Sequence, residues 1–181
     1  MPAVSLAEVD AAATALGRLL QSLGLLVASA ESCTGGLIAR SLTETAGSSS
    51  WFERGFVTYS NAAKQECLDV APDALRAHGA VSEPVARQMA QGALRHSHAA
   101  LALAVTGVAG PTGGAPDKPV GTVCFGWALR ADAGQGDPLV RSETVRFQGD
   151  RAAVRLQSAL HALNRAERLL RAELADRPPR A

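Results

Sequence analysis

The chain has 181 residues, 47% of them hydrophobic, and its 18 basic residues nearly balance its 17 acidic ones. This length suits one domain, expected over residues 1–181, and no block of like charges predicts a nucleic acid or an anionic membrane as partner. No apolar run approaches the roughly 20 residues that cross a bilayer, and the N-terminus lacks a secretory pattern. We therefore expect a cytoplasmic protein that binds a small molecule and neither nucleic acid nor membrane.

The first half of the chain alternates helical and strand patterns. Ser5, with Glu8 three residues later, is a capping pair that predicts a helix over about residues 6–22. The apolar run 25–30 has strand length and leads into AESCTGG (30–36), and residues 34–44 are helical in pattern. We expect the segments that follow to be a loop at 47–50, a strand at 56–60 and a helix at 61–70.

The second half continues the alternation. Prolines in the first turn predict helices at 72–78 and 83–97, and the apolar run 99–105 is typical of a central strand buried on both faces. Two further strands, at 120–130 and 139–148, are expected to form a hairpin. A long helix should cover 150–175, followed by a frayed tail at 176–181. The order predicts an α/β fold with helices covering a mixed sheet.

Two glycine-containing loops, ESCTGG and TGVAGPTGG, follow predicted strands. If these strands are parallel, both loops lie at one edge of the sheet and share one pocket. The helix that opens at residues 34–36 offers free backbone amides and a positive dipole end, which favour an anion. The alternative is a simple helix start capped by Ser32 or Thr34.

The segment TYSNAAK places a lysine in the first turn of a helix. With Ser60 as the N-cap, Tyr59 and Lys64 occupy the two positions of a hydrophobic staple, which would bring a phenol and an amine together. The helix dipole and burial would both lower the pKa of Lys64. The alternative is a surface lysine whose stem covers the tyrosine ring.

The four histidines lie in ordinary helical contexts, so the sequence gives little support to a Ser-His-Asp triad. A serine nucleophile would more readily use Lys64 as its base. The candidate serines are Ser32, Ser48 and Ser49, and spacing alone does not choose among them. Arg151 would lie in the first turn of the last helix, where the dipole disfavours a cation, and this placement hints at a ligand.

The three cysteines, Cys33, Cys67 and Cys124, lie far apart and lack the spacing of a zinc site. We expect them to act as small buried hydrophobic residues. His96 and His98 are two residues apart on a predicted helix and would point to different faces. No metal site is therefore expected.

Six segments, in this order, resemble the nicotinamide-nucleotide amidohydrolase family, also known as the C-terminal domain of the competence-damage-inducible protein. They are AESCTGGLIA, AGSSSWFERGFVTYSNAAK, HGAVSEPVARQMAQGAL, AVTGVAGPTGG, KPVGTV and FQGDR, between about Leu25 and Leu160. The resemblance implies a three-layer α/β/α fold, a homo-oligomer and no cofactor. It further implies hydrolysis of nicotinamide mononucleotide to nicotinate mononucleotide and ammonia, in pyridine nucleotide recycling.

The resemblance also implies roles for individual residues. Lys64 would be the base, Tyr59 would orient the catalytic pair, and Ser49 is our choice of nucleophile. The residues expected to bind the substrate are Ser32, Thr34, Gly35, Ser48, Thr106, Gly107 and Arg151. Two alternatives are a regulatory module, associated with competence or DNA damage, that binds a nucleotide without converting it, and a phosphoryl-transfer enzyme that uses ESCTGG as its phosphate loop.

Overall fold

The structure, a computed structural model, describes residues 4–130 and 136–175. The tail at 176–181, predicted to be frayed, lies outside the described residues, as does part of the connection between the last two predicted strands. None of the helices within the described ranges combines the length and the apolar character needed to cross a membrane.

Five strands of the described chain form one mixed sheet in the order β2-β1-β3-β4-β5. β1 (Val27–Glu31) is central to the parallel part, between β2 (Phe52–Val57) and β3 (Leu101–Gly107). β4 (Thr122–Leu129) pairs antiparallel with β3 and with β5 (Leu139–Arg146). The sequence prediction of a mixed sheet is confirmed. Because β1 and β3 are parallel neighbours, the loops that follow them share one edge.

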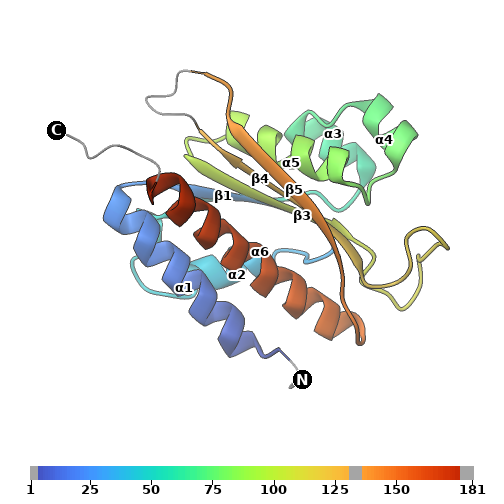
Figure 1. The fold of residues 1–181 in the computed structure, drawn as a ribbon, viewed down its shortest axis with the longest axis horizontal. Coiled ribbons are helices and arrows are strands. Elements are labelled where there is room, and N and C mark those ends of the chain that lie inside the picture. Colours follow the sequence, from blue (N-terminus) through green and yellow to red (C-terminus); the bar gives the residue numbers. More distant parts are fainter. Residues whose placement is uncertain (1–3, 131–135, 176–181) are drawn as a thin grey trace.

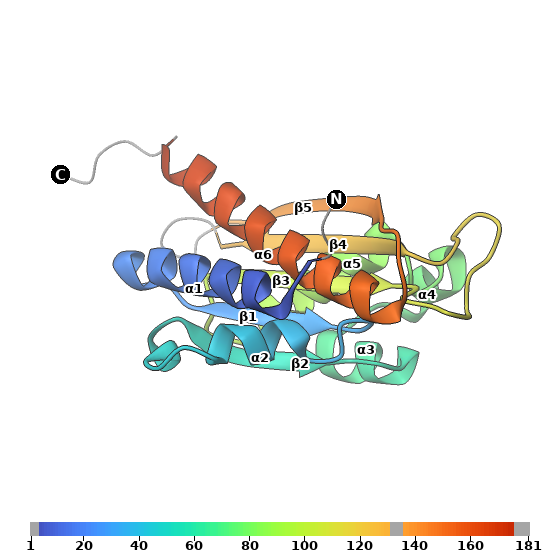
Figure 2. The same cartoon turned by 90° about the horizontal axis from the view of Figure 1, so that it is seen from below.

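Helices cover both faces of the sheet, as Figures 1 and 2 show. One face carries α1 (Leu6–Leu23), α2 (Leu37–Thr43) and α6 (Arg151–Ala175). The other carries α3 (Asn61–Leu68), α4 (Pro72–His78) and α5 (Glu83–Arg95). The three-layer α/β/α architecture is therefore confirmed.

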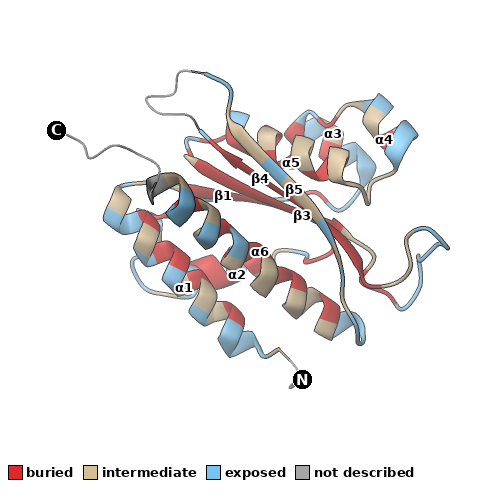
Figure 3. Cartoon of the chain, in the orientation of Figure 1, coloured by how far each residue is buried: buried red, intermediate tan, exposed pale blue. Residues whose placement is uncertain are grey.

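The core lies in two layers, one on each side of the sheet. Trp51, Phe125 and Leu163 belong to the layer beneath α1, α2 and α6. Leu68 and Met89 belong to the layer beneath α3, α4 and α5. Both faces of β1 and β4 are buried along their whole length, and Figure 3 shows these central strands as buried. This packing holds the ends of β1 and β3 in fixed positions.

Several elements begin one to four residues from the predicted position, and the differences at α2 and β2 concern the candidate site. The predicted helix at 34–44 begins only at Leu37, because Gly35 and Gly36 have φ values of +59° and +89° and form a turn instead. The predicted strand at 56–60 is β2, which ends at Val57 and is preceded by the 3₁₀ helix η1 (Ser48–Ser50). The stretch 58–60 is therefore a link between β2 and α3.

Candidate active site

The carboxyl ends of three parallel strands meet at one edge of the sheet and bring polar residues together. The Ser32 amide, just after β1, donates to the Val105 carbonyl of β3 at 3.0 Å. The Thr58 amide, just after β2, donates to the Glu31 carbonyl at 2.8 Å. Ligands of open α/β sheets bind at such an edge. The expectation that ESCTGG lies together with the loop that follows β3 (residues 108–121, hereafter the third loop) is therefore confirmed.

Lys64 is the central feature of this edge. Its side chain is only 1% exposed, although it sits in the first turn of α3, after the N-cap Ser60. Its Nζ donates to the Thr58 carbonyl at 2.7 Å and contacts Ser32 Oγ at 3.0 Å. Within the described residues, no carboxylate forms an ion pair with it. Burial therefore lowers the pKa of the Lys64 ammonium below its usual value.

The Ser32–Lys64 contact has the geometry of a nucleophile and its base. A neutral amine can accept the hydroxyl proton of Ser32 across the same 3.0 Å, while one of its own N–H groups stays on the Thr58 carbonyl. Ser32 is only half-buried, so the hydroxyl remains within reach of a ligand. The arrangement supports attack of a serine on an electrophilic carbon.

Glu31 corrects the prediction that the N-terminus of α2 binds the anion of a ligand. Its carboxylate is fully buried and accepts hydrogen bonds from the amides of Gly36 at 3.0 Å, Ile38 at 3.1 Å and Ala39 at 2.8 Å. These are the amides that an external anion would use. The protein's own carboxylate fills the position, so ESCTGG is not a phosphate loop.

Ser49 lies far from Lys64, which corrects the expected serine–lysine pair. Ser48 and Ser49 belong to η1, before β2, whereas Lys64 follows β2 on α3. The six residues of β2 span about 20 Å, and Figure 2 shows α3 beyond the other end of this strand. The structure thus brings Ser32 to Lys64 and leaves Ser48 and Ser49 at the other end of the strands, where β2 begins.

Tyr59 does not contact the Ser32–Lys64 pair through a hydrogen bond. Its ring is 60% exposed, and its hydroxyl accepts from Arg151 Nη2 at 2.8 Å. Arg151 Nη1 also donates to the Gly110 carbonyl in the third loop at 2.8 Å. The expected staple fails because the Lys64 side chain turns inward to Thr58 instead of crossing the tyrosine ring. Tyr59 and Arg151 together form an exposed wall that joins the 58–60 link to the start of α6.

Of the remaining predicted pocket residues, Thr106 and Gly107 have structural roles. Thr106 Oγ1 donates to the Ala80 carbonyl at 3.0 Å, which ties the end of β3 to the loop before α5. A Cβ on Gly107 would lie 2.8 Å from Val123 Cγ2, so the close approach of β4 requires glycine there. Thr34 is fully buried with its Oγ1 unpartnered, whereas Gly35 beside it is exposed.

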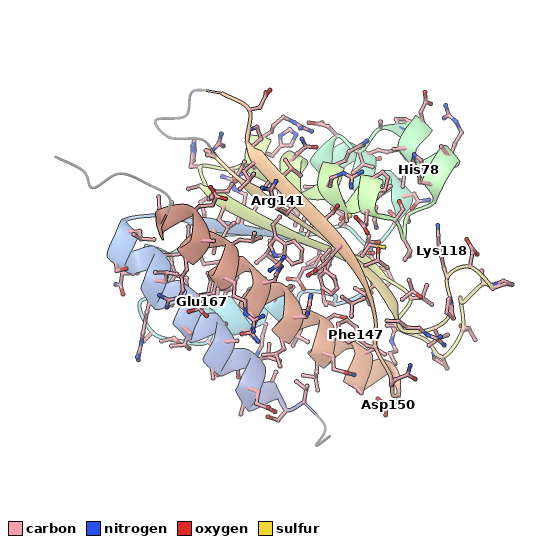
Figure 4. The ribbon with its side chains drawn as sticks, viewed as in Figure 1. His78, Lys118, Arg141, Phe147, Asp150 and Glu167 are labelled. Carbon is pink, nitrogen blue, oxygen red and sulfur yellow. The ribbon has the colours of Figure 1, made fainter. Side chains whose placement is uncertain are left out.

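Two contacts outside the pair order the surroundings of the site. Lys118, from the third loop, donates to the His78 carbonyl at the end of α4, and Figure 4 shows these two residues on neighbouring segments. Asp150 lies at the start of α6 and accepts from the Ala153 amide at 2.8 Å. Among the described residues, no group of three or more His, Cys, Asp or Glu side chains is arranged to hold a metal ion.

Three contributions to the site were missing from the sequence predictions: the Glu31 carboxylate, the Thr58 carbonyl and Arg155. Arg155 Nη2 donates to the Thr34 carbonyl at 2.7 Å. A signal for Arg155 was present, because it follows Arg151 by four residues and so lies on the same face of the predicted helix. No sequence signal pointed to the Thr58 carbonyl, because every residue has a backbone carbonyl.

Cys33 is next to Ser32 but is not a reactive thiol. Burial raises its pKa to about 12, so almost no thiolate forms near neutral pH. We expect iodoacetamide to alkylate the exposed Cys67 of the folded protein and to leave Cys33 unmodified. Peptide mass spectrometry would locate the label, and the urea-unfolded chain is the control in which all three cysteines should react. Rapid alkylation of Cys33 in the folded protein would contradict this assignment.

Comparison with known proteins gives a consistent set of similarities. The family model "CinA C-terminal domain" matches residues 9–170. A putative competence-damage inducible protein of Symbiobacterium thermophilum is 54% identical over 86% of this chain, which spans only 37% of that relative. The nicotinamide-nucleotide amidohydrolase PncC of Escherichia coli K12 is 50% identical over 82% of this chain and 86% of its own length.

Solved structures agree with the fold. A competence/damage inducible protein of Agrobacterium tumefaciens is 44% identical, with a TM-score of 0.80 over 91% of this chain and 94% of its own. A CinA superfamily protein of Klebsiella pneumoniae is 35% identical, with a TM-score of 0.83 over 91% and 98% of the two chains. Both similarities extend over nearly the whole α/β/α sandwich.

Proposed function

The chain belongs to the CinA C-terminal domain family, and we propose that it hydrolyses the carboxamide of nicotinamide mononucleotide to nicotinate mononucleotide and ammonia. The observation that carries this proposal is the buried Lys64 amine, 3.0 Å from Ser32 Oγ. Relatives of nearly the same length, at 50% and 52% identity, bear the name nicotinamide-nucleotide amidohydrolase. An amide hydrolase needs a nucleophile and a base, and this pair supplies both.

In the first half of the reaction, neutral Lys64 removes the proton from Ser32 Oγ. The oxygen attacks the carboxamide carbon, and the carbonyl oxygen becomes an oxyanion. Lys64, now an ammonium, gives its proton to the amide nitrogen, and the carbon–nitrogen bond breaks. Ammonia leaves, and nicotinate remains as an ester on Ser32.

In the second half, water replaces ammonia. Lys64 takes a proton from the water as the water oxygen attacks the ester carbon, and the same proton returns to Ser32 Oγ when the ester bond breaks. Nicotinate mononucleotide leaves and the pair is restored. Lowering of the Lys64 pKa by burial favours both halves, because each begins with the neutral amine.

The amide of Cys33 is suited to stabilise the oxyanion. It directly follows Ser32, and within the described part of the chain its one hydrogen-bonding neighbour is the weakly accepting sulfur of Cys33 itself. In other enzymes, loss of one such donor costs about 3 to 4 kcal/mol of transition-state stabilisation. Tyr59 and Arg151 offer an aromatic face and a cation beside the pair for the ring and the phosphate of the substrate.

As the family resemblance implies, we further propose that the protein acts in pyridine nucleotide recycling in the cytoplasm, as a homo-oligomer. Analytical ultracentrifugation would test the assembly. A single sedimenting species with the mass of one chain at micromolar concentration would contradict it.

The proposed reaction has a direct test. We expect the purified protein to release ammonia from nicotinamide mononucleotide and to form nicotinate mononucleotide in equal amount, measured by a coupled ammonia assay and by chromatography. Chelator in the assay should leave the rate unchanged, because the proposed chemistry uses only groups of the protein and water. Binding of the nucleotide without ammonia would favour the alternative of a regulatory module and would refute the enzyme assignment.

A further inference from the structure

We propose that Arg155 is a positioning residue for this hydrolysis, because it fixes the turn that carries the Cys33 amide, the donor proposed above for the oxyanion. The inference rests on Ser32 acting as the nucleophile of the proposed function. Arg155 lies one helical turn after Arg151 on α6. It is 121 residues from Thr34 in the sequence, so only the fold brings it to this turn. Its Nη2 reaches the Thr34 carbonyl at 2.7 Å.

A chain of hydrogen bonds connects Arg155 to the Cys33 amide. Arg155 holds the carbonyl side of the peptide group between Thr34 and Gly35. The N–H side of that same planar group, the Gly35 amide, donates to the Ser32 carbonyl at 3.0 Å. The Ser32 carbonyl belongs in turn to the peptide group that carries the Cys33 N–H. Since a peptide group is planar and trans, fixing the direction of this carbonyl fixes the N–H in the opposite direction.

The other end of the turn is already fixed by separate contacts. The Ser32 amide donates to the Val105 carbonyl of β3, and the Glu31 carboxylate holds the first amides of α2. Between these two anchors, the 34–35 peptide group is held by the Leu37 amide at 3.3 Å and by Arg155. Gly35 has φ +59° and is exposed, so Arg155 restrains a flexible point of the turn.

The charge of Arg155 favours the same step. Within the described residues, no carboxylate forms an ion pair with Arg155, whose guanidinium donates to the Thr34 carbonyl. A cation that already contacts the Thr34 carbonyl would lower the energy of negative charge that develops beside the neighbouring amide. Arg151 differs, because it holds Tyr59 and Gly110 on the outer wall.

The test compares Arg155→Met and Arg155→Lys with the control Arg171→Met. Arg171 is on the same helix, exposed and paired with Glu167, far along the chain from the turn. Steady-state turnover of nicotinamide mononucleotide would give kcat and KM. A second measurement would follow the rate at which a fluorophosphonate labels Ser32, a reaction in which Oγ displaces fluoride from phosphorus and Lys64 takes the proton. Thermal unfolding would report folding of each variant.

We expect Arg155→Met to lower kcat and the labelling rate about 10- to 100-fold, somewhat less than direct loss of an oxyanion donor. KM and the unfolding temperature should stay near those of the parent protein, Arg155→Lys should recover part of the loss, and Arg171→Met should have no effect. A rise in KM with unchanged kcat would overturn the inference in favour of substrate binding. Equal loss of activity and of folding in both Arg155 variants would overturn it in favour of a structural role.

The labelling experiment separates this inference from the proposed reaction. If the parent protein releases no ammonia but labels at Ser32 in an Arg155-dependent way, the proposed substrate is wrong and the positioning role stands. If Ser32 does not react in the parent protein, the positioning role of Arg155 is overturned together with the Ser32 assignment.

Discussion

Replacing Ser32 by alanine is expected to lower ammonia release from nicotinamide mononucleotide by about 10⁴-fold or more, the usual effect of losing a catalytic nucleophile. Ser32 Oγ is the hydroxyl in contact with the buried Lys64 amine, and alanine removes it without adding volume. Initial rates with equal amounts of folded protein would measure the loss. Mass spectrometry of the parent protein during turnover should find any trapped acyl group on Ser32.

Ser49→Ala is the matched control for this experiment. Ser49 lies in η1 and is exposed, with β2 between it and Lys64, so its replacement should change the rate by less than about twofold. Ser48→Ala should behave in the same way. Abolished turnover in Ser49→Ala, with normal turnover in Ser32→Ala, would reverse the assignment that the structure supports.

Replacing Lys64 by methionine is expected to lower kcat by about 10³-fold or more, because the variant keeps the length of the side chain but has no base. Nucleotide binding, measured by calorimetry, should persist. In the parent protein kcat/KM should rise with pH as Lys64 loses its proton. The midpoint of this rise should lie below the pKa of an ordinary lysine, because burial lowers the pKa of Lys64. Substantial turnover by Lys64→Met would contradict the role of Lys64 as base.

The same variant should show a pH-dependent change in stability. The folded protein has a lowered Lys64 pKa, so between that pKa and the unfolded value of about 10.4 the unfolded chain binds more protons. The contribution of Lys64 to the free energy of unfolding therefore improves as pH rises through this window. Relative to the parent, Lys64→Met should be more stable near pH 7 than near pH 10, because only the parent gains stability as the pH rises. Urea unfolding at both pH values would measure this, and a pH-independent difference would contradict the lowered pKa.

Most of the fold could be predicted because its signals are local. Ser5 and Glu8 form the capping box of α1, and Gly24 ends that helix with φ +64°. The apolar run ending at Val105 became a strand buried along nearly its whole length. The predicted strand at 56–60 was displaced, because β2 alternates weakly in burial and is an edge strand, for which the hydrophobic pattern is least informative.

Glu31 shows why the chemistry of a motif could be misread even when its place was right. The sequence located ESCTGG correctly, from the last residue of β1 to the residue before α2, and a glycine-containing turn before a helix is typical of an anion site. The spacing could not show that the Glu31 carboxylate itself occupies this anion site, because a carboxylate at a strand end can point outward or fold back over the start of the helix. Only the folded backbone shows Glu31 accepting three amides of its own chain.

The sequence by itself determined that Lys64 follows a Ser60 cap in the first turn of a helix. It also predicted that two polar loops share a sheet edge if their strands are parallel, and it favoured serine and lysine as the reactive residue types, which stays a prediction. These features depend on neighbours within a few residues. Which serine meets Lys64 was decided by tertiary structure alone, since Ser32 and Lys64 are 32 residues apart. Their contact depends on the parallel pairing of β1 with β2, which carries Ser32 and Lys64 to one edge and leaves Ser49 at the other. The order and direction of the strands depend on the packing of the whole core, so they cannot be predicted from any single short motif.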